Sequence, residues 1–335
     1  MHKLALIAAL VFPLSAAAQD HTPTLIDVTE NHILPRFTML AEATEVLNAT
    51  AQDCAPESQD LRTAYGTAFD AWISASHLRF GPTETDDRAF AMAFWPDTKG
   101  FTPKALSKHI AVEDSAVASP DAYAETSIAG RGFFALERML YDPEFNQQGS
   151  AAYRCALIQA ISADIDANAD AMVADWQTYA PELTQPAADG PYRTQDEALQ
   201  ELFKALSSGL QFTSETRLGR PLGTYDRPRP KRAEARRSER SLRHVELSLV
   251  STRDLAARLS AEHPEIATDL ETAFNRAIES VRSIDDPALA GVADPQGRFR
   301  IEALQQSIND IRQIAATELG PTLGISAGFN SLDGD

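Results

Sequence analysis

The chain is poor in basic residues: 30 Lys and Arg stand against 48 Asp and Glu, which gives a net charge of −18. A molecule this acidic repels polyanions, so nucleic acid is not expected among its partners. Only two of the 335 residues are cysteines. After the first residues, no apolar run approaches the roughly 20 residues that a spanning helix needs. We therefore predict no transmembrane segment in the mature chain.

Most sequence signatures of catalysis are also missing. The chain has no P-loop, no nucleophile elbow and no Gly-rich dinucleotide fingerprint. A zinc peptidase needs two His residues one helical turn apart, and His244 is followed at that distance by Ser248. No His lies three residues after a Glu, so the Glu-x-x-His pairs of di-iron bundles are absent. The sequence therefore assigns no catalytic residue.

The first 18 residues have the layout of a signal peptide. Lys3 precedes an apolar stretch from Leu4 to Leu14, and three alanines end at Ala18. We expect cleavage after Ala18 and export to the periplasm. In an oxidising compartment Cys54 and Cys155 are expected to form a disulfide, which would close a loop of about 100 residues.

Helical periodicity covers nearly the whole mature chain, and the polar and apolar alternation of strands is almost absent. An all-α fold is therefore predicted. Residues 184–193 are rich in Pro and lack periodicity, so we interpret them as a linker between helical bundles at 19–183 and 194–335. Each bundle has about four predicted helices, which would fit an internal duplication, although no residue-level repeat is found. Residues 80–119 contain helix breakers and are predicted to be irregular, with short helical turns.

Glu137 is the most unusual single residue. Phe133, Phe134, Leu140 and Tyr141 flank it at helical spacing, so a carboxylate is predicted on an apolar face. Burying an unpaired carboxylate is costly, so Glu137 should meet a cation or a metal, or stay protonated. The structural alternative is a salt bridge to Arg79 or Arg131.

Two further groups of polar residues are candidates for a site. His77 and Arg79 fall at the end of a predicted helix, where cations also complement the last carbonyl groups. His32 and Arg36 lie one helical turn apart and could share a site. The segment 227–243 holds eight Lys or Arg in an otherwise acidic chain. It is either an anion or partner-docking site or a solvated segment that pairs with the acidic body.

The sequence resembles the imelysin-like proteins over nearly the whole mature chain. The resemblance is carried by 72–82, 94–97, 132–137, 240–243 and 323–335. It implies a periplasmic or surface protein of two helical bundles that is associated with iron regulation or uptake, in a family first described as an insulin-cleaving peptidase. The family motif Gly-x-His-x-x-Glu is met here by Gly132, Phe134 and Glu137, so Phe replaces the motif His. Phe cannot bind a metal or move a proton, which favours binding over catalysis.

We therefore predict a periplasmic binding protein linked to iron uptake, with an unidentified ligand or iron-uptake component as its partner. The predicted ligand-binding residues are Glu137, Arg79, His77, Gly132, His32 and Arg36. Iron or another divalent metal is the candidate cofactor, with Glu137 and His77 as its candidate ligands. The alternatives are a divergent metallopeptidase and a protein that docks a partner through residues 227–243.

Overall fold

The computed structural model describes residues 20–325, so the predicted signal peptide and its cleavage site after Ala18 lie outside the described residues. Within this range the regular elements are helices, and the only strand-like feature is an isolated bridge between Thr224 and Arg227. The all-α prediction is confirmed. None of the helices in residues 20–325 is long and apolar enough to cross a membrane.

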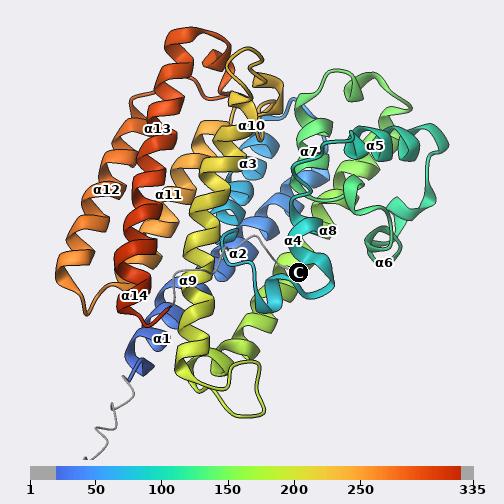
Figure 1. Cartoon of the computed structure of the whole chain (residues 1–335). Helices are drawn as coiled ribbons and strands as arrows, with labels where there is room; N and C mark the ends of the chain where they lie inside the picture. Colours follow the sequence, from blue (N-terminus) through green and yellow to red (C-terminus); the bar gives the residue numbers. More distant parts are fainter. Residues whose placement is uncertain (1–19, 326–335) are drawn as a thin grey trace, which may run out of the picture.

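The first half of the chain is organised around a long helix that starts near the N-terminus. Its parts are α1 (Thr22–Val28), a π-helical turn (Thr29–Ile33) and α2 (Leu34–Thr50). Helix α2 packs against both α3 (Gln59–Ala75) and the long α8 (Ala151–Thr184). These helices, arranged as Figure 1 shows, bury an apolar face with Phe37, Leu40 and Leu47 in the core.

The segment between α3 and α8 carries shorter helices: α4 (Arg88–Met92), α5 (Phe101–Val112), α6 (Pro120–Ala124) and α7 (Gly132–Tyr141). Helix α5 is longer than the short turns expected between residues 80 and 119. Gly100 and Pro103 are among the helix breakers of residues 80–119, but they mark the beginning of α5. Gly100 is its N-cap residue, and proline is accepted in the first turn of a helix. Asp97 accepts hydrogen bonds from the N–H groups of Phe101 and Thr102, which caps this helix.

The second half contains α9 (Gln195–Gln211), α10 (Gly219–Leu222), α11 (Ser241–Leu259), α12 (Pro264–Arg282), α13 (Pro295–Ile314) and α14 (Gly320–Thr322). Two π-helical segments, Phe212–Leu218 and Ala315–Leu319, follow α9 and α13. Thr194 caps α9 by accepting from the N–H of Glu197. Residues 185–194 connect α8 to α9.

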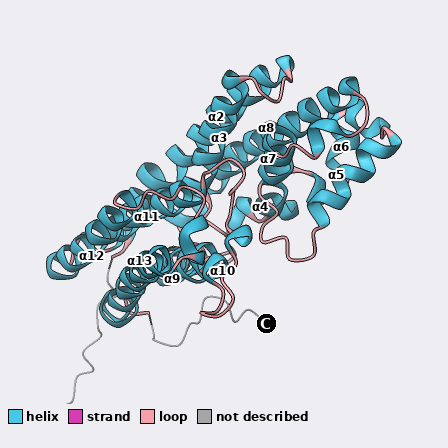
Figure 2. Cartoon of the chain, turned by 90° about the horizontal axis from the view of Figure 1, so that it is seen from above, coloured by secondary structure: helices cyan, strands magenta, loops and turns pink. Residues whose placement is uncertain are grey.

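The two halves pack against each other along α11. Helix α11 contacts α12 and α9 of its own half and also α3 and α1 of the first half. Seen from above, α2, α3 and α8 lie to one side and α9, α12 and α13 to the other, with α11 between them (Figure 2). One continuous cluster of buried apolar residues runs through both halves. The division into two bundles joined at 184–193 stays a prediction.

Cys54 and Cys155 form the predicted disulfide. Their Cα atoms are 5.1 Å apart, and 101 residues separate them in the sequence. Cys54 follows α2 and Cys155 lies in the first turns of α8, so the bond joins two helices that already pack together. The closed loop contains α3 to α7, including Glu137.

Replacing both cysteines by Ala should lower the free energy of unfolding by up to about 5 kcal/mol, because a loop of this length restricts the unfolded chain strongly. Urea unfolding of the oxidised mature chain and of the double variant measures the difference. Reduction of the native chain should reproduce the shift in midpoint, whereas equal midpoints would show that the bond contributes nothing.

Candidate functional site

Two histidines that are far apart in the sequence meet in the interior. His32 lies in the π-helical turn between α1 and α2, and His77 follows the end of α3. The turn widens just before Pro35, which has no N–H to donate and whose ring crowds the carbonyl one turn earlier. His32 Nε2 lies 2.8 Å from His77 Nε2, and both side chains are buried.

Asp254 fixes the arrangement of protons along this pair. Its Oδ2 is 2.7 Å from His32 Nδ1, and because a carboxylate only accepts, His32 carries its proton on Nδ1. Burial lowers the pKa of His32 to about 4, against the opposing hydrogen bond to Asp254. Burial also lowers the pKa of His77 well below its usual value, and the charge of Arg36 adds to this. Both rings are therefore neutral near pH 7, and His77 Nε2 donates to His32 Nε2.

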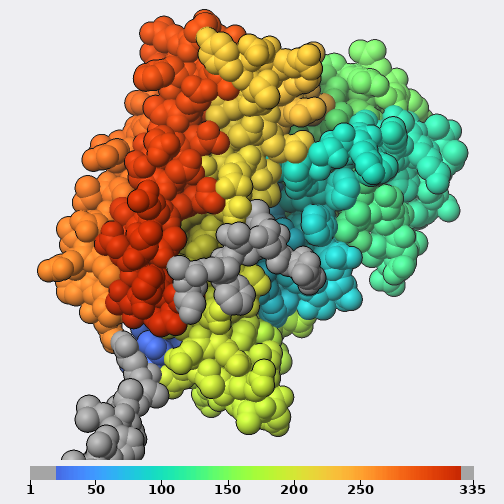
Figure 3. Space-filling model, viewed as in Figure 1, coloured from blue at the N-terminus to red at the C-terminus, as the bar shows by residue number. Residues whose placement is uncertain are grey.

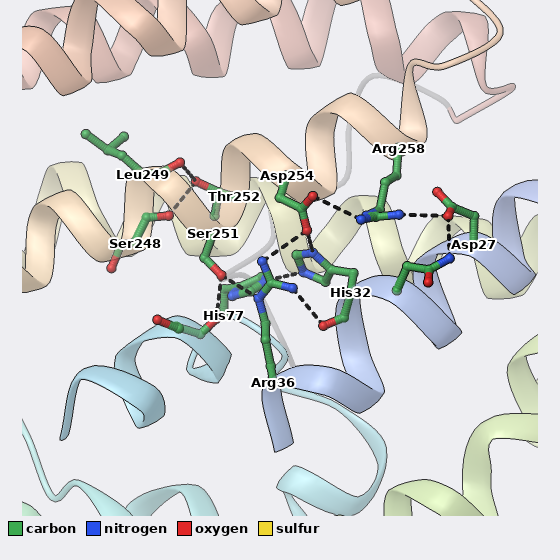
Figure 4. A network of polar contacts seen from close by, with 12 residues as sticks. Asp27, His32, Arg36, His77, Ser248, Leu249, Ser251, Thr252, Asp254 and Arg258 are labelled. Carbon is green, nitrogen blue, oxygen red and sulfur yellow. Dashed lines mark hydrogen bonds and ion pairs between the residues drawn. The ribbon is translucent and has the colours of Figure 1, made fainter. Parts of the chain in front are cut away.

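Arg36 and Asp254 extend the pair into a network between the two halves of the chain. Arg36 donates from Nε to Ser251 Oγ at 2.8 Å and from Nη2 to Asp254 Oδ2 at 3.0 Å. Arg258 pairs with Asp254 and with Asp27. Figure 4 shows these side chains between the blue ribbon of α1 and α2 and the pale orange ribbon of α11. The predicted pair of His32 and Arg36 and the separately predicted His77 thus belong to one cluster.

Glu137, on α7, is only 2% exposed, and its partners lie in the basic segment. Its Oε1 accepts from the N–H groups of Arg237 at 3.1 Å and Ser238 at 3.0 Å, and from the Ser238 hydroxyl at 2.8 Å. Ala235 and Glu239, on either side of these donors, have φ values of 45° and 56°. Turns of this kind direct successive N–H groups at an anion. Here that anion is the Glu137 carboxylate.

The structure does not bring the expected arginines to Glu137. Arg79 is partly exposed, pairs with Glu84 and lies over the Phe90 ring, 5.1 Å from its centroid. Arg131 pairs instead with the buried Asp164, at 2.6 Å between Nη2 and Oδ1. In the described residues no hydrogen bond or ion pair joins Glu137 to the histidine pair either. The predicted site residues therefore fall into two places, with Arg79 in neither.

A cavity of about 150 Å³ opens beside Glu137. Residues 94–102 and helix α7 form part of its wall, and α10 with the basic segment forms the rest, so both halves of the chain contribute. Five cationic side chains and two carboxylates line it, together with Phe94, Trp95 and Phe134. In Figure 3 the gold segment around residues 225–240 meets the teal and green surface of residues 90–140, where these walls approach each other.

Comparison with known proteins identifies the family. The imelysin family model matches residues 33–315, which is most of the chain. The chain belongs to the imelysin family. Iron-regulated protein A of Synechococcus elongatus is 24% identical over 312 residues, which cover 85% of this chain and 82% of that protein.

Two solved structures share the imelysin-family fold. An imelysin-like protein from Psychrobacter arcticum has a TM-score of 0.80 at 21% identity, over 95% of this chain and all of that one. A putative iron-regulated protein A precursor from Parabacteroides distasonis has a TM-score of 0.72 at 13% identity, over 90% of this chain and 96% of that one. At these identities the likeness concerns the fold.

Gly132 and Phe134 stand at the Gly and His positions of the imelysin motif, and local contacts in the structure explain both residues. Gly132 has a φ of 71°, and a Cβ atom there would lie 2.1 Å from the Ala91 carbonyl oxygen. Only glycine therefore lets α7 start so close to α4. The Phe134 ring packs against Phe69, with 5.3 Å between ring centroids, and lines the cavity.

Sequence reasoning missed several residues of this imelysin-family site. Arg217 Nε lies 2.8 Å from Glu234 Oε2, and each side chain is 5% exposed. Burial alone would raise the pKa of Glu234, but the charges of Arg217 and His244 lower it to about 2. An acidic residue inside a basic run was the available signal. Nothing in the sequence indicated that Trp95 and Arg220 would line the same cavity.

The histidine pair predicts a loss of stability in acid. The folded-state pKa of His32 is lower than its unfolded value of 6.5, so the unfolded chain binds more protons than the folded chain between about pH 6.5 and pH 4. The free energy of unfolding therefore decreases as the pH is lowered through this range. From pH 7 to pH 5 the fall due to His32 should be on the order of 1 to 2 kcal/mol. His32→Gln should lack this part of the fall in urea titrations, and His263→Gln should retain it. Parallel profiles for the native chain and His32→Gln would contradict the assignment.

Gly132→Ala should destabilise the fold by about 2 to 4 kcal/mol, because the left-handed backbone and the clash with the carbonyl groups of α4 add together. The matched control is Gly324→Ala, since Gly324 has a φ of 74° and no atom lies within 4 Å of the position that its Cβ would take. That variant should lose only about 1 to 2 kcal/mol. Equal losses in thermal or urea unfolding would show that close approach to α4 is unimportant.

Proposed function

We propose that this imelysin-family chain is a periplasmic binding protein of an iron-uptake process, and that it holds a small charged ligand in the cavity beside Glu137. The observation that carries the proposal is the cavity itself. It lies at the Glu of the family motif, and charged side chains from both halves of the chain line it. A concave site with a few convergent polar groups is the usual form of a ligand site.

The link to iron is supported by the relatives. The Synechococcus protein is named an iron-regulated protein, and one of the similar structures is named as a putative precursor of such a protein. An exported protein whose synthesis responds to iron supply would need a ligand site to take part in iron uptake. The disulfide between Cys54 and Cys155 supports export, because such bonds persist in oxidising compartments.

Binding is favoured over the other two functions that the sequence left open. A peptidase would need a base or a metal at the motif, where Phe134 offers neither. Docking through the whole of residues 227–243 is less favoured, because Arg237, Arg240 and Arg243 pair with acids of the body. Lys231 and Arg232 line the cavity instead. The basic segment thus supports the same ligand site.

The test is calorimetric titration of the oxidised mature chain with ferric citrate, citrate, zinc and, without oxygen, ferrous iron. At least one probe should bind saturably at one site. Trp95 lines the cavity while Trp72 and Trp176 are buried in the core, so binding should also change a fluorescence signal that Trp95→Phe removes.

Glu137→Gln should weaken this binding tenfold or more, because the amide loses the charge that holds the N–H groups of the basic segment. Glu246→Gln is the control, since Glu246 pairs with Arg243 and Arg282 in the second half and does not line the cavity. Circular dichroism checks that both variants fold. Unchanged binding in Glu137→Gln, or no binding of any probe, would refute the proposal.

A further inference from the structure

The cavity does not fit a bare metal ion. The described residues contain no group of three or more His, Cys, Asp or Glu side chains placed to hold one. Glu137 Oε1 already accepts three hydrogen bonds from the basic segment. The other predicted ligand, His77, is paired with His32 next to the cations Arg36 and Arg217. A metal cation would enter surroundings that are already positive.

The two carboxylates of the cavity wall are both committed. Asp97 accepts from the first N–H groups of α5, and Glu137 accepts from the loop at 237–238. Arg138 and Arg237 also line the cavity, and both pair with Asp142 at 3.1 and 2.8 Å. These four lining groups therefore already have hydrogen-bond or ion-pair partners in the protein.

The side chains of Arg220, Lys231 and Arg232 have no such partner among the described residues. In residues 20–325 none of the three side chains takes part in an ion pair or donates a hydrogen bond. Arg220 Nε is buried without an acceptor. Burial lowers the pKa of Arg220, and the nearby charge of Arg232 lowers it further. Three cations thus face one cavity in a chain whose net charge is −18.

Arg220 is also held in position before any ligand arrives. Its guanidinium carbon lies over the Trp95 ring, 5.8 Å from the centroid. At this distance the indole face attracts the guanidinium, and the N–H groups of Arg220 stay available to form two parallel bonds to one oxyanion. The attraction restricts this side chain in the free protein, which lowers the entropic cost of binding.

We propose that the cavity is a site for a small multivalent oxyanion, bound by Arg220, Lys231 and Arg232. The ligand chemistry is carboxylate or phosphate, since both accept paired bonds from guanidinium groups. This assignment depends on the proposed function and gives its ligand class. Iron would reach the cavity as an anionic chelate, such as ferric citrate, with the acidic groups of the chelator facing the cations. A volume of about 150 Å³ is roughly ten times the space that holds one water molecule, so a small multivalent anion has room.

Titrations of the oxidised mature chain with citrate, ferric citrate, phosphate, zinc and ferrous iron test the ligand class. Citrate or phosphate should bind saturably, and the citrate and ferric citrate arms show whether iron adds to the affinity. Arg220→Gln and Lys231→Gln should each raise the dissociation constant at least tenfold. Arg229→Gln removes the same charge from an exposed position of the same segment outside the cavity wall, and it should change the constant less than twofold.

The outcomes separate the two proposals. Binding of ferrous iron or zinc that Glu137→Gln abolishes, without binding of any anion, would overturn the oxyanion site and leave the proposed function standing. Anion binding that Arg220→Gln and Lys231→Gln leave intact would also overturn it. Failure of all five probes would refute both. Because the side chains of Arg220 and Lys231 form no ion pair or hydrogen bond within residues 20–325, circular dichroism and urea midpoints should match those of the native chain. Loss of binding is then attributable to the cavity.

Discussion

The contact between the Glu137 carboxylate and the N–H groups of Arg237 and Ser238 is the interaction on which the cavity depends. It joins α7 of the first half to the basic segment of the second, across 100 residues of sequence. Ala235 and Glu239, the two residues with positive φ on either side, give the loop a backbone shape whose N–H groups converge on an anion. Because the Glu137 side chain accepts these hydrogen bonds, the loop is fixed and one wall of the cavity is formed.

Two further buried pairs lie near the same interface. The Arg217 and Glu234 pair precedes the loop, and its low exposure makes it costly to break, since either partner alone would be an uncompensated buried charge. The neutral pair of His32 and His77 is joined to α11 through Asp254, the hydrogen-bond partner of His32. Arg217 Nη2 lies 3.4 Å from Ser76 Oγ, beside His77, so polar contacts run from the histidines towards the cavity.

Local features of this fold could be predicted from the sequence, and long-range partners could not. Helical periodicity predicted the all-α architecture, and an even number of cysteines in a chain expected to be exported predicted the disulfide. Glu137 was recognised as unusual because its apolar neighbours are local. Its partners are backbone N–H groups, which every residue carries, so no side-chain pattern could reveal them. Arg79 has the right charge for Glu137 but pairs with Glu84, five residues away, because the chain turns directly after α3.

The acidic body and the cationic cavity act over different distances. An anion that approaches in dilute buffer first meets the long-range field of a molecule with net charge −18, which slows its arrival. At physiological ionic strength that field is screened beyond about 8 Å, whereas the cations of the cavity act at contact. Salt therefore speeds the encounter of an anion with this protein, although it slows the encounter of anions with most basic surfaces. The surrounding acidity also keeps larger polyanions away from the cavity at any salt concentration that leaves the field unscreened.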